Sequence, residues 1–175
     1  MQLRNSVMKI ESERLIISRF TMDMAEAVHH NSLDADNRRF VPDEVFETVE
    51  EAAETIEYLM SVYDSGEGPL VYPVSLKEGA YIGYVQAVPL EGNVWEIGYH
   101  IGGGYTGNGD ATEAVKAFLP VIMSRLGISS IAGVCLAENK ASIKVMERCG
   151  FVKEFEGMGS YQGEEKNICR YNFSI

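Results

Sequence analysis

A glycine-rich turn between an extended and a helical segment is the part of this sequence that points most directly to chemistry. The turn contains Gly107, Asn108 and Gly109, and apolar residues follow at helical spacing from Ala111 onward. Glycine lets a ligand approach the backbone closely, and the free N–H groups and dipole of a helix N-terminus favour an anion. The turn therefore predicts a phosphate or pyrophosphate site. Taken alone, it also fits a tight strand-to-helix connection.

Neither of two common nucleotide motifs is complete at this turn. Residues 102–107 have the glycine spacing G-x-G-x-x-G, but no ribose-binding acid follows about 20 residues later, and G-x-x-x-x-G-K-[ST] is absent. NAD and ATP are therefore disfavoured as ligands of the predicted site.

The extended segment before the turn, residues 94–101, carries the candidate proton acceptors. Alternation along a strand places Glu96 and His100 on one face and Tyr99 on the other. A general base must lie within hydrogen-bond reach of the proton that it removes, directly or through water. We take Glu96 as the first candidate, with His100 or an ordered water as alternatives, although Glu96 also fits a solvent-exposed strand position and His100 a packing role. Tyr99 is expected to point into the core and to have no catalytic role.

The elements that would position these residues follow a mixed order. Apolar periodicity predicts strands over 15–20, 71–76, 81–88, 94–101, 128–136, 151–161 and 167–173. Helices are expected over 21–32, from the capping box at Thr48 to Tyr63, over 111–125, and from Asn139 to about Gly150. Residues 34–41 read as an open polar connection. The fold class is therefore α/β (α+β): a mostly antiparallel sheet of about seven strands with about four helices.

Composition and charge narrow the classes of protein. A chain of 175 residues fits one domain, 1–175, with one core. The formal net charge of -11 opposes binding to nucleic acid or to an anionic membrane and could attract a cationic substrate. Three cysteines without metal-ligand spacing are expected to be reduced and buried, and no metal is expected. With no signal peptide or apolar span in view, we expect a cytoplasmic protein.

Several spaced motifs together resemble one enzyme family. ESERLIISRF, EIGYHI, GNGDATEAVKAF and AENKASIKVMERCGFVKE follow in the order and spacing of the GNAT superfamily of N-acetyltransferases, in its Rim-type branch, which acetylates protein N-termini and small amines. The resemblance covers nearly the whole chain. It implies the GNAT fold, acetyl-CoA as acetyl donor, and transfer to a primary amine by direct attack in a ternary complex without a metal.

The resemblance also assigns the cofactor site. The family's loop, Q/R-x-x-G-x-G/A, falls on residues 106–111, and the backbone amides of the loop cradle the pyrophosphate. Two positions are unfavourable for CoA binding. Thr106 departs from the family pattern by replacing a long donor with a short hydroxyl, and the carboxylate of Asp110 would repel phosphates unless it points away. The residues that the resemblance places at the cofactor are His100, Ile101, Thr106, Gly107, Asn108, Gly109, Asp110, Ala111, Thr112, Asn139 and Ser142.

The same resemblance gives roles to the start of the helix at residue 139. Asn139 and Ser142 match the family's N-x-x-S, in which Asn contacts pantetheine and Ser lies near the thioester sulfur. Both residue types are also ordinary in a helix cap. With the family's context, Ser142 becomes the candidate for protonating the departing thiolate, Glu96 the candidate base, and the amides near Ile101 the groups that polarise the carbonyl.

The acceptor is less defined by the sequence. In such enzymes the substrate wall comes from residues 38–46 and 157–166, which here offer Phe40, Phe46 and Tyr161 as apolar wall residues and acidic neighbours, Glu44 among them, for a cation. The acceptor is either a protein N-terminus or a small amine, and a homodimer accords with the resemblance. A non-catalytic CoA-binding sensor with the same fold is the alternative, which weak CoA binding through Thr106 and Asp110 would favour.

Overall fold

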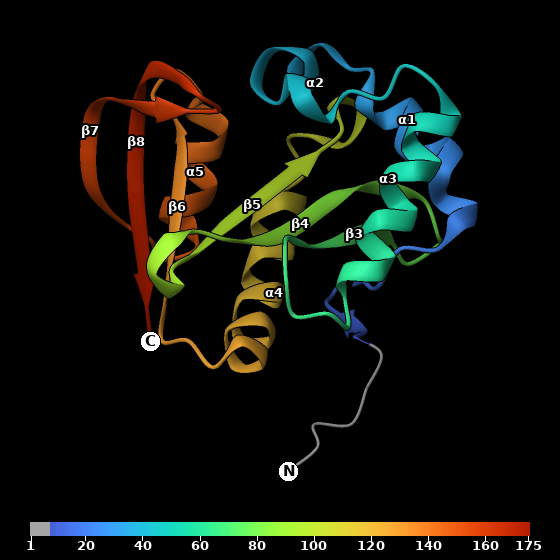
Figure 1. Ribbon diagram of the computed structural model, residues 1–175, viewed down its shortest axis with the longest axis horizontal. Helices are drawn as coiled ribbons and strands as arrows, with labels where there is room; N and C mark the ends of the chain where they lie inside the picture. The colour runs from blue at the N-terminus through green and yellow to red at the C-terminus, as the bar shows by residue number, and fades with distance from the viewer. Residues whose placement is uncertain (1–7) are drawn as a thin grey trace.

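One twisted sheet runs through the protein (Figure 1), whose computed structural model describes residues 8–175. The strand order is β1-β2-β3-β4-β5-β6-β8-β7, and every neighbouring pair is antiparallel except β5 and β6. The strands are β1 Ile10–Glu11, β2 Leu15–Ile17, β3 Leu70–Leu76, β4 Tyr81–Pro89, β5 Trp95–Ile101, β6 Ser130–Leu136, β7 Val152–Tyr161 and β8 Glu164–Ser174.

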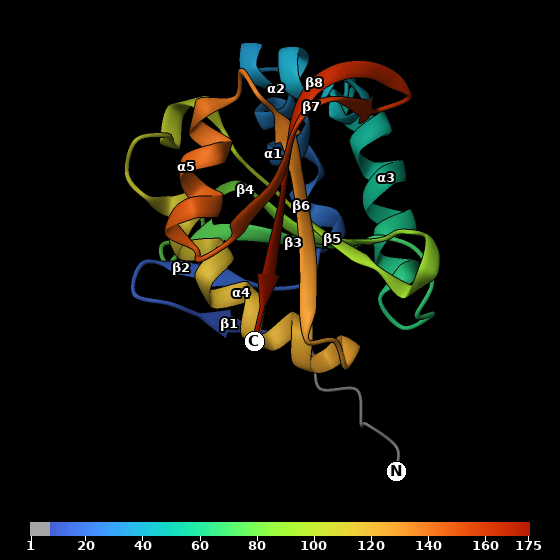
Figure 2. The same cartoon turned by 90° about the vertical axis from the view of Figure 1, so that its left-hand side faces the viewer.

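Helices cover both faces of this sheet. Figure 2 shows α3 on one side of the strands and α4 and α5 on the other. The α-helices are α1 Ala25–Ser32, α2 Ala35–Phe40, α3 Val49–Val62, α4 Asp110–Leu126 and α5 Lys140–Arg148. Four short 3-10 helices, η1 Met22–Met24, η2 Pro42–Glu44, η3 Glu91–Asn93 and η4 Gly103–Tyr105, join the larger elements. The predicted α/β class and mostly antiparallel sheet are confirmed, with one strand and one α-helix more than expected in the described chain.

Local sequence signals account for helix α3. The Thr48 hydroxyl accepts a hydrogen bond from the N–H of Glu51 (3.1 Å), which is the predicted cap of α3. Ala52, Ile56 and Leu59 then point from one face of that helix into the core, at the spacing that the sequence predicts. Capping and periodicity agree, so the helix begins where the sequence expects it.

Two short elements were not foreseen. Residues 34–41, expected to be an open connection, contain α2, because the Asp34 side chain caps its first turn by accepting from the N–H of Asn37 at 2.6 Å. The segment before α1 is also not one strand: β1 and β2 form a hairpin, with Ile10 opposite Ile17. Both elements are too short for periodicity to reveal.

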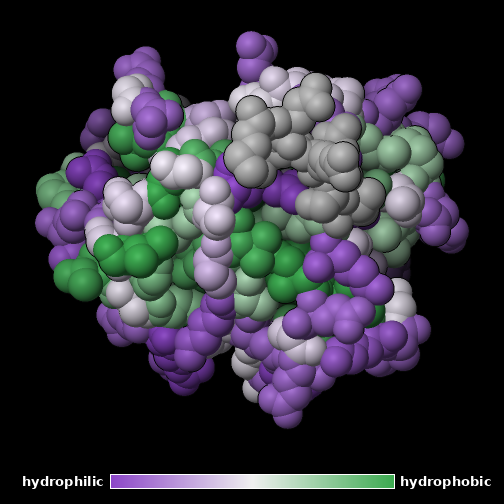
Figure 3. All heavy atoms as spheres, turned by 90° about the horizontal axis from the view of Figure 1, so that it is seen from below, coloured by the Kyte–Doolittle hydropathy of each residue, from purple (hydrophilic) through white to green (hydrophobic). Residues whose placement is uncertain are grey.

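The core lies on both sides of the central strands, with Tyr72, Phe118 and Ile122 fully buried. All three cysteines are free and buried, as predicted. Figure 3 shows hydrophobic side chains gathered across the middle of the face seen from below, with hydrophilic residues around them. Within residues 8–175, no helix has the length and apolarity to span a membrane, and no cluster of His, Cys, Asp or Glu could hold a metal ion.

Candidate active site

The site begins where two parallel strands separate. β5 pairs with β6 only at Glu96, opposite Ala132, and at Ile97, opposite Gly133. On its other edge β5 stays paired with β4 as far as Ile101. The backbone of residues 98–101 therefore has one edge with no partner strand along β6, which leaves peptide groups able to pair with an extended ligand.

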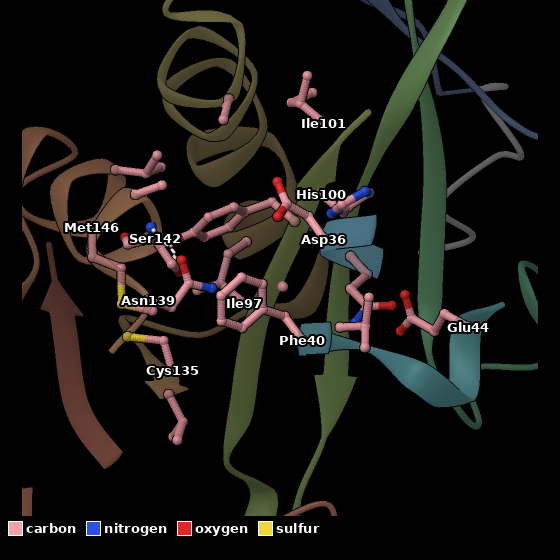
Figure 4. Close-up of a pocket in the computed structure, with 18 of the residues that line it drawn as sticks. Asp36, Phe40, Glu44, Ile97, His100, Ile101, Cys135, Asn139, Ser142 and Met146 are labelled. Atoms are coloured by element: carbon pink, nitrogen blue, oxygen red, sulfur yellow. Dashed lines mark hydrogen bonds between the residues drawn. The ribbon is translucent and has the colours of Figure 1, made fainter. Parts of the chain in front are cut away.

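A pocket of about 380 Å³ occupies this split. Figure 4 shows Asn139, Ser142 and Cys135 on one side of it and Glu44 on the other, with Ile97 and Phe40 between them. Its walls therefore come from both halves of the sheet and from the α2–η2 segment. Of the residues that the sequence assigned to the site, those lining it are Phe40, Glu96, His100, Ile101, Thr106, Ala111, Asn139, Ser142 and Tyr161.

The glycine loop leads from this pocket to the N-terminus of α4. Gly107 (φ 85°) and Gly109 (φ 79°) have left-handed backbones, and Gly109 is the N-cap of the helix. A side chain at residue 107 would meet nothing within 4 Å, so the space above the turn is open. Because the first-turn N–H groups of α4 lack intrahelical acceptors, the loop is a cradle suited to an anion.

The side chains of Thr106 and Asp110, which the sequence suggested would weaken CoA binding, both have partners within the protein. The Thr106 hydroxyl donates to the carbonyl of Gly103 at 3.1 Å. The Asp110 side chain is 4% exposed, and its Oδ1 lies 3.1 Å from Nη1 of Arg14, which also pairs with Glu113. The Asp110 carboxylate therefore forms an ion pair with Arg14 at the N-terminus of α4, so that its charge is balanced within the protein.

The two candidate bases share one face of β5, as alternation predicts. Burial raises the pKa of Glu96 above its ordinary value of 4.5. Burial also lowers the pKa of His100, against the opposing effect of Asp34, whose Oδ2 lies 3.6 Å from His100 Nε2. The imidazole is therefore neutral at pH 7 and packs against the ring of Tyr84. Its Nε2 faces Asp34, so Glu96 stays the first candidate base of the two.

Tyr99 contacts a site residue that the sequence did not link to it. Its ring packs against the core, as expected, but its hydroxyl lines the pocket and lies 2.9 Å from both the hydroxyl and the carbonyl oxygen of Ser142. Burial raises the pKa of Tyr99, so the phenol keeps its proton near neutral pH. The split between β5 and β6 opens the core-facing side of β5 to the pocket, and alternation along one strand gives no sign of this.

Asn139 and Ser142 show that the capping and the functional interpretations are compatible. The Asn139 side chain caps α5 by accepting from the N–H of Ser142 at 3.2 Å, and both residues line the pocket. The cap fixes the first turn of α5 against the pocket wall, and Tyr99 orients the Ser142 hydroxyl there.

The predicted substrate wall is only partly on this pocket. The Tyr161 hydroxyl donates to the carbonyl oxygen of Phe40 at 3.2 Å and so joins the β7–β8 turn to α2. Phe46 lies instead on a second cavity, beside α1 and α3. Glu44 lines both spaces, and burial raises its pKa to about 7. Its acidic charge was noted in the sequence, but nothing there marks it as buried.

Comparisons with known proteins agree with this geometry. The family model described as an acetyltransferase (GNAT) domain matches residues 14–152. The chain belongs to this family. As predicted, it is an N-acetyltransferase, and its fold is the GNAT fold.

Individual GNAT relatives are distant in sequence. An uncharacterized N-acetyltransferase from Bacillus subtilis, YnaD, is 28% identical over 149 residues, or 84% of each chain. The crystal structure of a GNAT-family acetyltransferase from Bacillus anthracis superposes with a TM-score of 0.79 at 27% identity, covering 95% of this chain and 98% of that one. RimL, a ribosomal L7/L12 alpha-N-protein acetyltransferase in complex with coenzyme A, gives a TM-score of 0.83 at 20% identity, covering 96% and 98%. The last likeness is one of fold.

Proposed function

We propose that this N-acetyltransferase, a member of the Rim-type branch, acetylates a primary amine in the pocket between β5 and β6, with Glu96 and Ser142 on its walls. The observation that carries the proposal is the early separation of β5 from β6, which brings an unpaired backbone edge, a buried carboxylate and a serine hydroxyl together in one pocket. The acceptor is a small amine or a protein N-terminus.

The residues present fit acetyl-CoA, which is the acetyl donor. The left-handed glycines and first-turn amides of α4 form a cradle for the pyrophosphate, and the free edge of residues 98–101 suits an extended pantetheine arm. Asp110, turned toward Arg14, does not oppose this. Of the two residues that favour a CoA-binding sensor, Asp110 therefore no longer does so, and Thr106 is the one left.

Acetyl-CoA supplies the acetyl group as a thioester, whose C–S bond breaks as the amine nitrogen forms the new C–N bond. Glu96 accepts one proton from that nitrogen, directly or through a water, and its raised pKa makes it a stronger base than an exposed glutamate. The Ser142 hydroxyl donates its proton toward the departing sulfur, and Tyr99 can resupply that proton across their 2.9 Å contact. The N–H groups near Ile101 polarise the carbonyl. Much of the rate enhancement then comes from positioning.

Thermal-shift titration with acetyl-CoA, CoA, ATP and NAD, followed by thiol release across a panel of amines, tests this function. We expect CoA species alone to raise the melting temperature and at least one class of amine to release thiol. Stabilisation without turnover on any small amine or N-terminal peptide would favour the sensor. A cytoplasmic location and a homodimer stay predictions, and gel filtration tests the second.

A further inference from the structure

A second cavity of about 190 Å³ lies beside the acceptor pocket, between the sheet and helices α1 and α3. Most of its wall is apolar, and the side chains that form this wall include Phe20, Val28, Phe46, Ile56, Leu59 and Tyr81. An apolar cavity of roughly 150 Å³ is large enough to hold benzene. The space beside the pocket therefore has room for a phenyl ring or a branched alkyl group.

The cavity and the acceptor pocket have a common wall. Glu44, Tyr84 and Gln86 line both spaces. Tyr84 and Gln86 lie on β4 opposite His100 and Gly98 of β5. The Gln86 side chain lies across Gly98 of β5. A Cβ added at residue 98 would come within 2.6 Å of the Gln86 amide nitrogen. The two spaces therefore adjoin at these three side chains, on either side of them.

Two buried oxygen atoms beside this wall lack a hydrogen-bond donor within residues 8–175. Glu44 Oε2 and Asn37 Oδ1 are both buried without a hydrogen-bond partner among the described residues, whereas the Asn37 amide donates to the carbonyl of Glu44 at 3.0 Å. Buried acceptors without donors are unfavourable and are normally satisfied. In Figure 4 the Glu44 side chain projects from η2 at the pocket. A ligand that brings an ammonium group supplies the missing donor and charge.

We propose that the acceptor is a primary amine with an apolar body, aromatic or branched alkyl, whose ammonium group is bound by Glu44 and whose body enters the second cavity. The inference rests on the proposed function, because the bound nitrogen must also reach Glu96. Glu44, Glu96 and Tyr161 all line the same pocket. Glu44 then holds the ammonium group. One of its protons leaves to water so that the nitrogen can attack, and Glu96 takes the second as the C–N bond forms.

Kinetics with matched amines test the proposal. The panel is phenethylamine and isoamylamine, which have apolar bodies, against ethylamine, spermidine and a peptide with a free N-terminus, all followed by thiol release. We expect kcat/KM to be at least about tenfold higher for the first two, since removing several buried methylene groups lowers it by that much or more. Acetyl-CoA binding, measured separately by thermal shift, shows whether the proposed function itself holds.

Four variants, one of them a control, test the cavity and Glu44 separately. Val28→Phe places a ring in the cavity and should abolish the preference for apolar amines while leaving ethylamine turnover unchanged; Thr55→Leu, on a half-buried position of α3, serves the same purpose if the first variant unfolds. Glu44→Gln should raise KM about tenfold or more for all amines, because a charged hydrogen bond is lost. Glu50→Gln, an exposed carboxylate on α3, is the charge-matched control and should change neither.

Two outcomes overturn the inference. Turnover that prefers spermidine or the peptide, with no effect of filling the cavity, would leave the enzyme's function intact and refute the apolar acceptor. A Glu44→Gln variant that matches Glu50→Gln in KM would remove Glu44 from ammonium binding. No turnover with any amine would instead count against the proposed function, on which this inference depends.

Discussion

Replacing Tyr99 by phenylalanine removes one hydroxyl group from the wall of the acceptor pocket and changes nothing else in side-chain shape. The hydroxyl lies 2.9 Å from the Ser142 hydroxyl and 2.9 Å from the Ser142 carbonyl oxygen. Having one proton, it donates to one of them at a time. The carbonyl also belongs to the first turn of α5, whose helical N–H groups remain available to it. The loss is therefore one net hydrogen bond, about 1 kcal/mol.

This magnitude fixes two expectations for Tyr99→Phe. The melting temperature should fall by about 2–4 °C, which is what about 1 kcal/mol represents in a domain of this size. If Tyr99 only orients and resupplies Ser142, kcat should fall about fivefold, the rate equivalent of the same energy. Ser142→Ala removes the charge-assisted hydrogen bond to the departing sulfur and should reduce kcat by about 10- to 150-fold.

The double variant decides whether the two hydroxyls act as a unit. Initial rates of thiol release, at saturating acetyl-CoA and amine, give kcat for the wild type, both single variants and the pair. If Tyr99 works through Ser142, the double variant should be no slower than Ser142→Ala. A double variant whose loss equals the product of the two single losses would refute the coupling, and a loss of more than about 10³-fold in Tyr99→Phe alone would make Tyr99 itself the proton donor.

Four further changes test other parts of the site. Glu96→Gln should lower kcat by about 10²-fold or more. In the wild type the rate should rise with pH through a midpoint above 4.5, and the variant should lack this rise. A variant that keeps the rise would exclude Glu96 as the base. Gly107→Ala should raise the calorimetric Kd for acetyl-CoA, because a Cβ at φ 85° costs about 1–2 kcal/mol; an unchanged Kd contradicts the proposed cradle. Asp110→Asn should lower the melting temperature and leave that Kd within about twofold, since the carboxylate faces Arg14; markedly tighter binding would show that it faces the phosphates. Glu44→Gln should raise the melting temperature at about pH 8 and have little effect at about pH 4. Burial raises the pKa of Glu44 from 4.5 to about 7 in the folded protein, so the wild type loses stability as pH rises from about 4.5 to 7 and the carboxyl becomes a buried charge. Equal shifts at both pH values would contradict the burial of this charge.

Sequence reasoning reached the parts of the structure that local signals determine. Patterns within a few neighbouring residues determine the Thr48 cap, the apolar faces of α3 and α4, and the glycine loop. The helix α2 was missed because its six residues show no apolar period, and its cap depends on Asp34 alone. Alternation also placed Glu96 and His100 on one face of β5 correctly.

Features that depend on two distant segments could not be inferred from the sequence. Tyr99 reaches Ser142 only because β5 and β6 separate after Ile97, and no pattern within either strand states where they part. The neutralisation of Asp110 requires Arg14, almost one hundred positions earlier in the chain. Glu44 likewise becomes buried only where distant segments meet around it, beside Tyr84 and Gln86 of β4, so an acidic loop residue gave no sign of its raised pKa.

The central claim is that acetyl-CoA lies in the split between β5 and β6 with its pyrophosphate on the loop before α4. Hydrogen–deuterium exchange with and without CoA tests this most directly, because it reports backbone amides one segment at a time. We predict slower exchange over residues 98–101 and 107–112, with the exposed surface of α3 unchanged. Binding of CoA that leaves both segments exchanging at their free rates would contradict the account.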